Sequence, residues 1–365
     1  MSETNEHLVF VTSCRAGDEG AITAFKLDKT TGVLEQTERY GEVENPFFIA
    51  LSPDRKYLYS VHVSGGFDSD TGSIAAFELV GDSGRLRKLN EQSAEGVTTC
   101  YVDIDPTGKA VTFANYTSGS VGSFPVLADG SLGQLASFVQ NQGASLVNAG
   151  RQEGPHAHCA VISPDGRHMF ACDLGTDQVL GFALDAATAT LTPLDQAYVR
   201  TIGGGGPRHF TYHPQGGYVY ANNELTNSVN VYSYDSDSGG LIERQVISSL
   251  PEDFDGESYT ADVKITPCGR FLYCTNRMHD SIAIYRIGDD GRLSLVEIQP
   301  CLGNFAQNLA ITADGTTLLC ANMQAAEPGG EGENVVVFRI DGESGKLSPL
   351  GEPTPLASPS CIMIV

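Results

Sequence analysis

The chain has 365 residues but no tryptophan, and its nine cysteines include no CxxC pair. The first absence excludes repeats that carry a Trp-Asp signature. The cysteines are odd in number and lie mostly inside predicted strands, which is typical of buried free thiols in a reducing compartment. Basic residues are also scarce, because 22 Lys and Arg stand against 45 Asp and Glu and give a net charge of −23. This charge argues against a nucleic acid as partner.

Long apolar runs are missing as well. The sequence contains no apolar run of 18 residues, and its N-terminus does not pass from basic to apolar residues. It therefore predicts neither a membrane span nor a secretory signal. We expect a cytoplasmic protein with no membrane partner.

What the sequence does contain is a repeat. Six strand-like runs end in a turn, and a polar residue follows nine positions after the turn residue, at intervals of 46 to 58 residues between units. The turn residues are Pro53, Pro106, Pro164, Pro214, Pro267 and Ala313, and the polar residues are His62, Asn115, Asp173, Asn223, Asn276 and Asn322. Such a register indicates one supersecondary unit copied several times. Because the polar column is common to all units, Asn223 and Asn276 are interpreted as structural hydrogen-bonding residues.

Each unit reads as four short strands joined by Gly, Asp and Pro turns, which predicts an antiparallel meander. Repeated meanders predict an all-β fold of the β-propeller type. Residues 7 to 40 carry only the last three strands of a unit, whereas Pro359 to Val365 resemble a lone first strand. Joined, the two ends complete a seventh blade, so we predict one closed domain over residues 1–365. Closure by the C-terminal strand would also remove an exposed sheet edge.

The turns divide the predicted ring into two faces. Asp-rich turns, such as those at Asp54, Asp165 and Asp314, should share one face. The long insertions at 63–72, 140–155 and 323–333 should lie on the other, and insertions gathered on one face usually mark the binding side.

The repeats also align the residues at this second face. A hairpin centred two residues past the proline would place the residue six before it opposite the residue ten after it. Four ionisable residues from consecutive blades then meet at one rim: His158, Arg208, Glu224 and Arg277. Since first strands line the channel of a propeller, we expect these side chains to converge in a pocket.

Each of these candidate residues also has a simpler interpretation. Arg208 and Glu224 could be only a cross-strand ion pair, and Arg277 could be an isolated surface arginine. The spacing of His156 and His158 could hold a metal, although arginines nearby argue against a cation. The glycines at 203–206 could suggest phosphate binding, but without a strand-turn-helix context a flexible connection between blades is the better interpretation.

Several motifs in these regions resemble one known family. They are Arg151-Gln152, Gly154-Pro-His-Ala-His158, Gly206-Pro-Arg-His209, Asn223-Glu-Leu225, Asn276-Arg277, His279-Asp-Ser-Ile282, Ala114-Asn-Tyr116 and Gly119-Ser-Val121. Together they make nearly the whole chain similar to the lactonase family of seven-bladed β-propellers. This family includes the propeller-type 6-phosphogluconolactonase and the 3-carboxymuconate lactonizing enzyme.

The resemblance implies catalytic roles for His158, Arg208, Glu224 and Arg277. It adds candidates for substrate binding: Arg151, His156, His209, Asn276 and His279. It implies hydrolysis of a small anionic sugar lactone, with 6-phosphogluconolactone expected first and neither cofactor nor metal required. His62-Val63, Asp262 and Gln307-Asn308 depart from the family pattern and bear on the choice of substrate.

Two other functions stay open from the sequence. The same four residues could serve a cycloisomerase of the carboxymuconate lactonizing type, and a propeller rim could bind a partner protein without catalysis. The oligomeric state, expected to be a monomer or weak dimer, is not specified by any motif.

Overall fold

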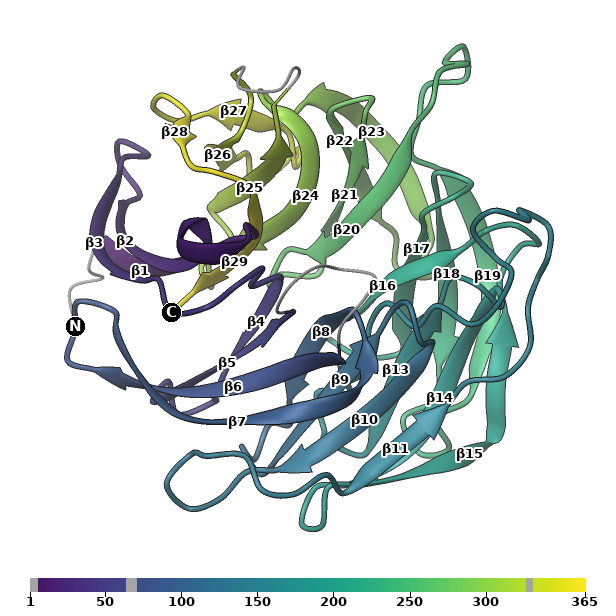
Figure 1. The fold of residues 1–365 in the computed structure, drawn as a ribbon. Coiled ribbons are helices and arrows are strands. Elements are labelled where there is room, and N and C mark those ends of the chain that lie inside the picture. Colours follow the sequence, from purple (N-terminus) through teal and green to yellow (C-terminus); the bar gives the residue numbers. More distant parts are fainter. Residues whose placement is uncertain (1–5, 64–70, 326–330) are drawn as a thin grey trace.

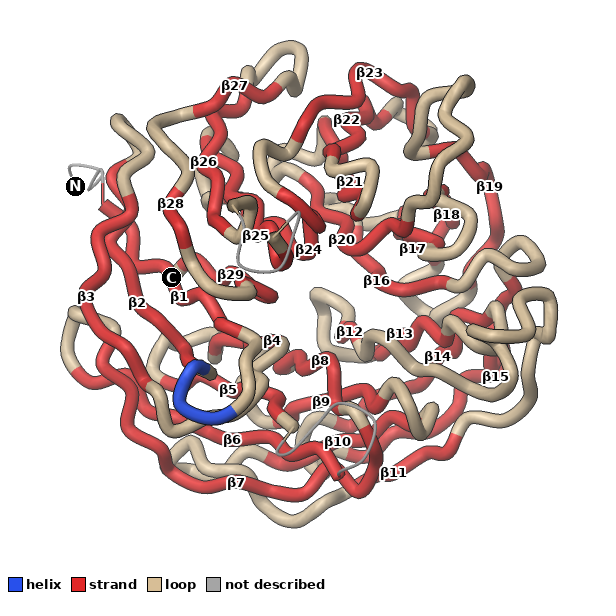
Figure 2. Tube along the Cα trace, turned by 45° about the horizontal axis from the view of Figure 1, so that its top comes forward, coloured by secondary structure: helices blue, strands red, loops and turns tan. Residues whose placement is uncertain are grey.

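The computed structural model describes residues 6–63, 71–325 and 331–365. It confirms an all-β, seven-bladed propeller in which seven antiparallel sheets form a ring (Figure 1). Figure 2 shows the first strand of each blade nearest the ring axis and the fourth strand at the outside. The described residues contain one helix, a 3-10 turn at Gly17–Glu19, so none of their helices is long enough to cross a bilayer.

The strands follow the predicted order of four per blade. The first three complete blades are β4 (Phe48–Leu51), β5 (Tyr57–His62), β6 (Thr71–Val80) and β7 (Arg85–Val97); β8 (Thr99–Ile104), β9 (Ala110–Asn115), β10 (Ser120–Pro125) and β11 (Ser137–Gln140); and β12 (Val161–Ile162), β13 (His168–Asp173), β14 (Gln178–Asp185) and β15 (Thr190–Arg200). The next three are β16 (Pro207–Tyr212), β17 (Tyr218–Asn223), β18 (Ser228–Tyr234) and β19 (Leu241–Ser248); β20 (Tyr259–Ile265), β21 (Phe271–Arg277), β22 (Ser281–Ile287) and β23 (Leu293–Pro300); and β24 (Asn304–Ile311), β25 (Thr317–Gln324), β26 (Asn334–Ile340) and β27 (Leu347–Pro349), with β28 (Thr354–Pro355) also on β26.

The two chain ends share the remaining blade, as the partial repeats predict. Its order is β29 (Pro359–Ile364), β1 (Glu6–Ser13), β2 (Ala21–Asp28) and β3 (Leu34–Tyr40). Strand β29 pairs with β1 from Val9↔Ile364 to Thr12↔Cys361, and the Thr12 and Ser360 hydroxyls lie 2.8 Å apart. The C-terminal strand therefore closes the ring.

The repeated turns have a common chemical basis. The hydroxyl of Ser52 accepts from the Tyr57 amide at 2.9 Å, and that of Ser163 accepts from the His168 amide at 3.0 Å. Thr266 and Thr312 repeat this contact. A short polar side chain before the turn thus satisfies a backbone donor that the hairpin leaves free.

The repeated polar column is structural, as expected. Asn115, Asn223 and Asn276 donate at 2.9–3.0 Å to Ser120, Ser228 and Ser281, the first residues of the following strands. Adjacent blades are also joined by tyrosines of the second strands. The Tyr220 hydroxyl donates to the Gly291 carbonyl at 2.9 Å, and a Cβ at Gly291, where φ is +75°, would meet the Tyr218 ring at 2.3 Å. Only glycine fits this left-handed turn beneath an aromatic ring.

The cysteines are free, and eight of the nine are buried, whereas Cys268 is exposed. Of the long insertions predicted for the binding face, 140–155 is described, but 64–70 and 326–330 lie outside the described residues.

Candidate active site

A β-bulge near the start of the first strand shapes the site. In β16, Pro207 pairs with Asn223 and Phe210 with Ala221, so Arg208 and His209 together oppose Asn222. The unpaired amide of His209 donates to the Asn222 side chain at 3.0 Å. Strands β8, β20 and β24 shift register at the same point. Bulges re-aim side chains, and here they occur where the site residues lie.

Because of the bulges, the observed strand register differs from the predicted one. The hairpin β16–β17 pairs Tyr212 with Val219, which places its centre half a residue nearer the proline than predicted, and the bulge adds a further shift. Arg277 accordingly pairs with Tyr259, not with Ala261. The prediction of directly opposed rim residues was wrong, because regular alternation has no place for an inserted residue.

The four predicted rim residues nevertheless line one pocket of about 300 Å³, at the face opposite the Asp-rich turns. His158, Arg208, Glu224 and Arg277 have exposed fractions between 1 % and 8 %. Other residues at the same repeat positions, six before or ten after the turn residue, also line this pocket: Phe47, Cys100, Tyr116, Gln307 and Met323. The structure thus brings four ionisable groups together from blades whose strands are far apart in sequence.

Glu224 is the centre of the charged group. Its Oε2 lies 2.9 Å from Arg208 Nε and 2.9 Å from Arg277 Nη2, and its Oε1 lies 2.5 Å from Arg151 Nη2. Burial by itself would raise the pKa of Glu224, but the three guanidinium charges outweigh it and hold the pKa well below its usual value. Glu224 therefore stays ionised and cannot serve as a proton donor near neutral pH.

Arg277 is held on the rim by the neighbouring strand and by aromatic rings. It donates to the Tyr259 and Thr260 carbonyls at 3.2 and 3.3 Å, and its guanidinium lies 5.0 Å from the centre of the Phe305 ring. Burial lowers its pKa to about 10, which still leaves it charged at pH 7. Because Arg277 is buried and forms an ion pair with Glu224, its interpretation as an isolated surface arginine is excluded.

His158 follows an isolated bridge at Ala157 and directs its ring into the pocket wall. Its Nδ1 lies 3.8 Å from the Cys100 sulfur, and its ring meets the Tyr116 ring edge-on at 5.3 Å. Burial, followed by the charge of Arg208, holds the pKa of His158 well below 6.5. The imidazole is therefore neutral at physiological pH and can accept a proton.

Arg151 reaches the pocket from the long 140–155 connection. Besides Glu224 it contacts the Tyr116 hydroxyl at 3.2 Å and the face of the Tyr259 ring at 5.6 Å. About a third of its side chain is exposed. Its neighbour Gln152 is buried and donates at 2.7 Å to Asp177, which fixes this end of the loop.

The same aspartate orders the glycine segment. Asp177 accepts from the Gly204 and Gly206 amides at 2.6 and 2.8 Å, and the Gly206 carbonyl accepts from the Glu224 amide at 2.7 Å. The predicted flexible connection is therefore a loop wrapped on an internal carboxylate. The glycine amides do bind a carboxylate, but it is the side chain of Asp177 and not that of a ligand. The loop that Asp177 holds in this way positions Glu224.

Four other candidates lie outside the pocket lining. His209 lies beneath Arg208, with its Nε2 3.2 Å from Arg208 Nη1. Asn276 is buried inside its blade between Ser249 and Ser281. His279 contacts Ser281 at 2.7 Å and packs against Phe254.

His156 stacks on Tyr116, and its ring nitrogens contact the Tyr116 carbonyl at 3.1 Å and Glu153 at 3.0 Å. Both nitrogens are thus engaged, and the described residues contain no group of three or more His, Cys, Asp or Glu that could hold a metal.

Sequence reasoning missed three residues that line the pocket, Thr98, Phe305 and Gln324. Thr98 and Phe305 have a positive φ, of 59° and 62°. The Phe305 amide donates to Asp280 at 2.7 Å, which holds this strained residue over Arg277. No sequence signal marks a positive φ at a non-glycine residue of this kind.

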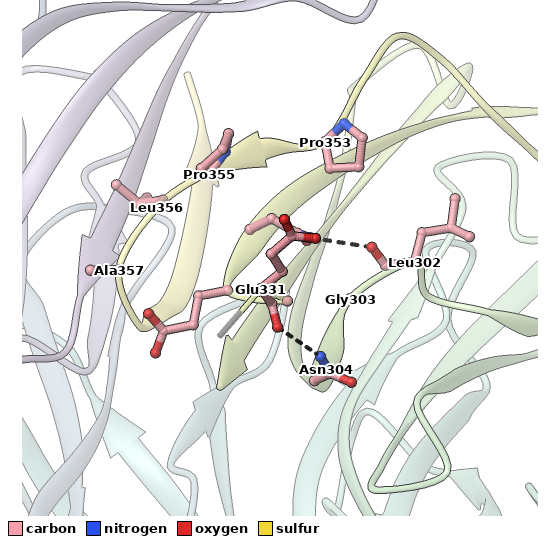
Figure 3. Close-up of a pocket in the computed structure, with 11 residues that line it drawn as sticks. Leu302, Gly303, Asn304, Glu331, Pro353, Pro355, Leu356 and Ala357 are labelled. Carbon is pink, nitrogen blue, oxygen red and sulfur yellow. Dashed lines mark hydrogen bonds between the residues drawn. The ribbon is translucent and has the colours of Figure 1, made fainter. Parts of the chain in front are cut away.

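A larger cavity of about 860 Å³ lies between β28 and the segment Leu302–Asn304 (Figure 3). Asn304 donates to the Glu331 carbonyl at 3.3 Å, and the carboxylates of Glu331 and Glu333 line the cavity. None of the described residues in its lining is a histidine, lysine or arginine. It therefore offers neither a base of the His158 kind nor a cation for an anionic ligand.

Comparison with known proteins places this geometry in a family. A model of the lactonase family, described as a seven-bladed β-propeller, matches residues 8–364. The chain is 32 % identical over 352 residues to the 6-phosphogluconolactonase of Bacillus subtilis, which covers 96 % of both chains. It is 32 % identical over 334 residues to that of Formosa agariphila, covering 90 % of this chain and 91 % of the relative.

A solved structure is also similar to this chain. The periplasmic gluconolactonase of Pseudomonas aeruginosa superposes with a TM-score of 0.90 at 28 % identity and covers 99 % of both chains. The family match, the near full-length relatives and the ring of seven blades lead to one conclusion: the chain belongs to the lactonase family of seven-bladed β-propellers.

Proposed function

We propose that this protein hydrolyses a small anionic sugar lactone and that 6-phosphogluconolactone is its substrate. The observation that carries the proposal is a buried, neutral histidine beside three arginines that share one carboxylate. The arginines leave a surplus of positive charge in a small pocket, which suits a phosphorylated ligand. The relatives from B. subtilis and F. agariphila carry the same activity in their names.

The proposed reaction begins with water. His158 removes a proton from a water molecule as its oxygen attacks the lactone carbonyl carbon. The carbonyl oxygen becomes an oxyanion, which Arg208 stabilises. The bond from the carbonyl carbon to the ring oxygen then breaks, and protonated His158 returns its proton to the leaving alkoxide. The products are a carboxylic acid and a hydroxyl group on one open chain.

The remaining charged groups have binding roles in this proposal. Arg277 holds the phosphate, and Arg151 supplies a second cation at the pocket mouth. Glu224 keeps three like-charged guanidinium groups in place, because its carboxylate offsets their mutual repulsion. Neither a metal nor a cofactor has a step in this scheme. A cytoplasmic location and a monomer or weak dimer complete the proposal.

An unphosphorylated gluconolactone is the second candidate, because the P. aeruginosa neighbour is named a gluconolactonase. The two substrates should be assayed side by side, with carboxymuconate as a test of the cyclase alternative. A clear preference in kcat/KM for the phosphorylated lactone supports the proposal. Equal rates would favour the second candidate, and no hydrolysis of either lactone would contradict both.

Replacement of Arg277 with alanine should separate these substrates further. We expect KM for the phosphorylated lactone to rise about 10-fold to 100-fold with a smaller change in kcat, because a phosphate contact acts equally in ground and transition states. The unphosphorylated lactone should change little. The matched control is Arg292→Ala, at an exposed arginine on the far face whose side chain pairs with Asp290. An unchanged KM for the phosphorylated substrate would refute this role of Arg277.

The pH profile should reflect the neutral state of His158. Its lowered pKa keeps the base form present well below pH 6.5. We expect kcat/KM to stay level from pH 8 to about pH 6 and to fall only at lower pH. Circular dichroism should accompany the assay: histidines that are buried and neutral take up protons on unfolding, so stability falls as pH drops below about 6.5. An inflection at or above pH 6.5, with folding intact, would contradict a neutral His158.

A further inference from the structure

Beneath the pocket floor, a chain of hydrogen bonds leads from Arg208 into the central channel. Arg208 Nη1 lies 3.2 Å from His209 Nε2, and His209 Nδ1 lies 2.8 Å from Asp262 Oδ1. All three side chains are buried, with exposed fractions of 4 % or less. The hydrolytic mechanism proposed above uses neither His209 nor Asp262.

The aspartate is fixed from several sides. Its Oδ2 accepts from the Asn308 side chain at 2.8 Å and the Leu309 amide at 2.9 Å, and Lys264 Nζ lies within 2.9 Å of both oxygens. Burial by itself would raise the pKa of Asp262, but Lys264 and His209 lower it well below its usual value. Asp262 is therefore a fixed, ionised hydrogen-bond acceptor.

These partners determine which nitrogen of His209 carries the proton. A guanidinium can only donate, so Nε2 must accept from Arg208 and has no proton. The proton then lies on Nδ1, which faces Asp262. The ring is held by edge-on contacts with Tyr101 and Phe48 at 5.3 and 5.7 Å. Burial and the charge of Arg208 lower the pKa of His209 to about 4, so the ring is neutral at pH 7.

We propose that Asp262 and His209 are positioning residues, which hold the guanidinium of Arg208 in the orientation that stabilises the oxyanion. Asp262 keeps the proton on Nδ1 of His209, and the free Nε2 in turn fixes Arg208 Nη1. The Ala261 carbonyl accepts from the same nitrogen. Arg208 Nη2 makes no hydrogen bond with any residue that the structure describes, so it is the terminal nitrogen left for the substrate. The catalytic part of this inference rests on the proposed lactone hydrolysis.

The tautomer can be measured without any substrate. In the intact protein labelled with 15N-histidine, we expect His209 to show a protonated Nδ1 and an unprotonated Nε2. In Asp262→Asn, the amide can donate to Nδ1, and the proton should move at least partly to Nε2. A wild-type His209 protonated at Nε2 would overturn the inference whatever the activity.

Kinetics test the consequence. We expect kcat of Asp262→Asn to fall about 10-fold to 100-fold with KM changed less than threefold, because a misaligned donor loses part of its transition-state stabilisation. His209→Phe should lose a similar factor, since it keeps the ring packing but removes the acceptor.

The matched control is Asp103→Asn, in the same channel. Asp103 accepts from the Ile104 and Ile162 amides and does not contact His209. It should leave the His209 signals unchanged and kcat within twofold.

The outcomes separate this inference from the proposed function. If Asp262→Asn keeps the wild-type tautomer, or loses no more kcat than Asp103→Asn, the positioning role is wrong. Should Asp262→Asn not fold, His209→Phe carries the kinetic test, and full kcat in that variant would refute the role. If the wild type hydrolyses no lactone but shows the expected tautomer, the proposed function fails while the hydrogen-bond chain stands.

Discussion

Replacement of His158 with alanine should lower kcat by about 10²-fold or more, because general base catalysis contributes a factor of about 10² to 10⁴. Of the four residues assigned catalytic roles in the pocket, His158 is the neutral base. Glu224 is held ionised by three arginines, and the other two are arginines themselves. KM should change little, because the phosphate contacts remain. The measurement is steady-state hydrolysis of 6-phosphogluconolactone near neutral pH, with the spontaneous rate subtracted.

The control for this variant is His7→Ala. His7 is half-buried on β1 and interacts electrostatically with Lys29 and Asp314 at the far face. It should keep the wild-type kcat. Thermal unfolding of both variants separates a catalytic loss from a folding loss. Retention of full kcat by His158→Ala would rule out the hydrolytic mechanism proposed here.

Deletion of residues 358–365 should destabilise the ring by about 5 kcal/mol or more. Strand β29 buries Cys361 and Ile362 and supplies the hydrogen-bond partners of β1. Its loss exposes apolar side chains, at about 1.5 to 3 kcal/mol for a buried isoleucine, and leaves backbone groups of β1 unpaired. This is a large part of the 5 to 15 kcal/mol typical of a folded domain. Denaturant and thermal unfolding should both detect it.

Point substitutions and an added peptide test the same closure of the ring by β29. Ile362→Ala keeps the strand but removes a side chain that is 4 % exposed, and should cost about 2 to 5 kcal/mol. Ile242→Ala, at a side chain 66 % exposed on β19, should cost almost nothing. A peptide of residues 358–365 added in excess should restore part of the lost stability. A truncated protein with an unchanged thermal midpoint would contradict closure by this strand.

Much of the fold could be predicted from the residues. The turn signature repeats because a short polar side chain before each turn satisfies the same backbone amide, as Ser52 and Ser163 do. The incomplete units at the two ends predicted that Pro359 to Val365 would join residues 7 to 40, because an unpaired strand edge is unfavourable. The convergence of His158, Arg208, Glu224 and Arg277 also followed from the repeat register. These are local or periodic properties, and the sequence carries them directly.

Other features depended on contacts between distant segments. Asn276 belongs to a motif that suggested binding, yet the interior of its blade satisfies its amide. Arg151 reaches Glu224 from the 140–155 loop, and Asp177 joins that loop to the glycine segment. The pairing of His209 with Asp262 joins two blades through residues 53 positions apart. The repeat register places these two residues at equivalent positions of consecutive blades, five before Pro214 and Pro267, but it does not show that their side chains meet.

The sequence by itself thus determined the number of blades, the closure of the ring and the rim on which the charged residues gather, because the alternation of strands and the chemistry of turns are local. Only the tertiary structure decided how these charged side chains pair with one another and which further residues, such as Thr98 and Phe305, line the pocket. An extra residue in β16 and in β20 shifts the hydrogen-bond ladder and turns Arg208 and Ala261 away from the register that regular strands would give. A bulge places two residues of one strand opposite a single residue of the neighbouring strand. Its position therefore depends on how the two strands pair in the folded protein.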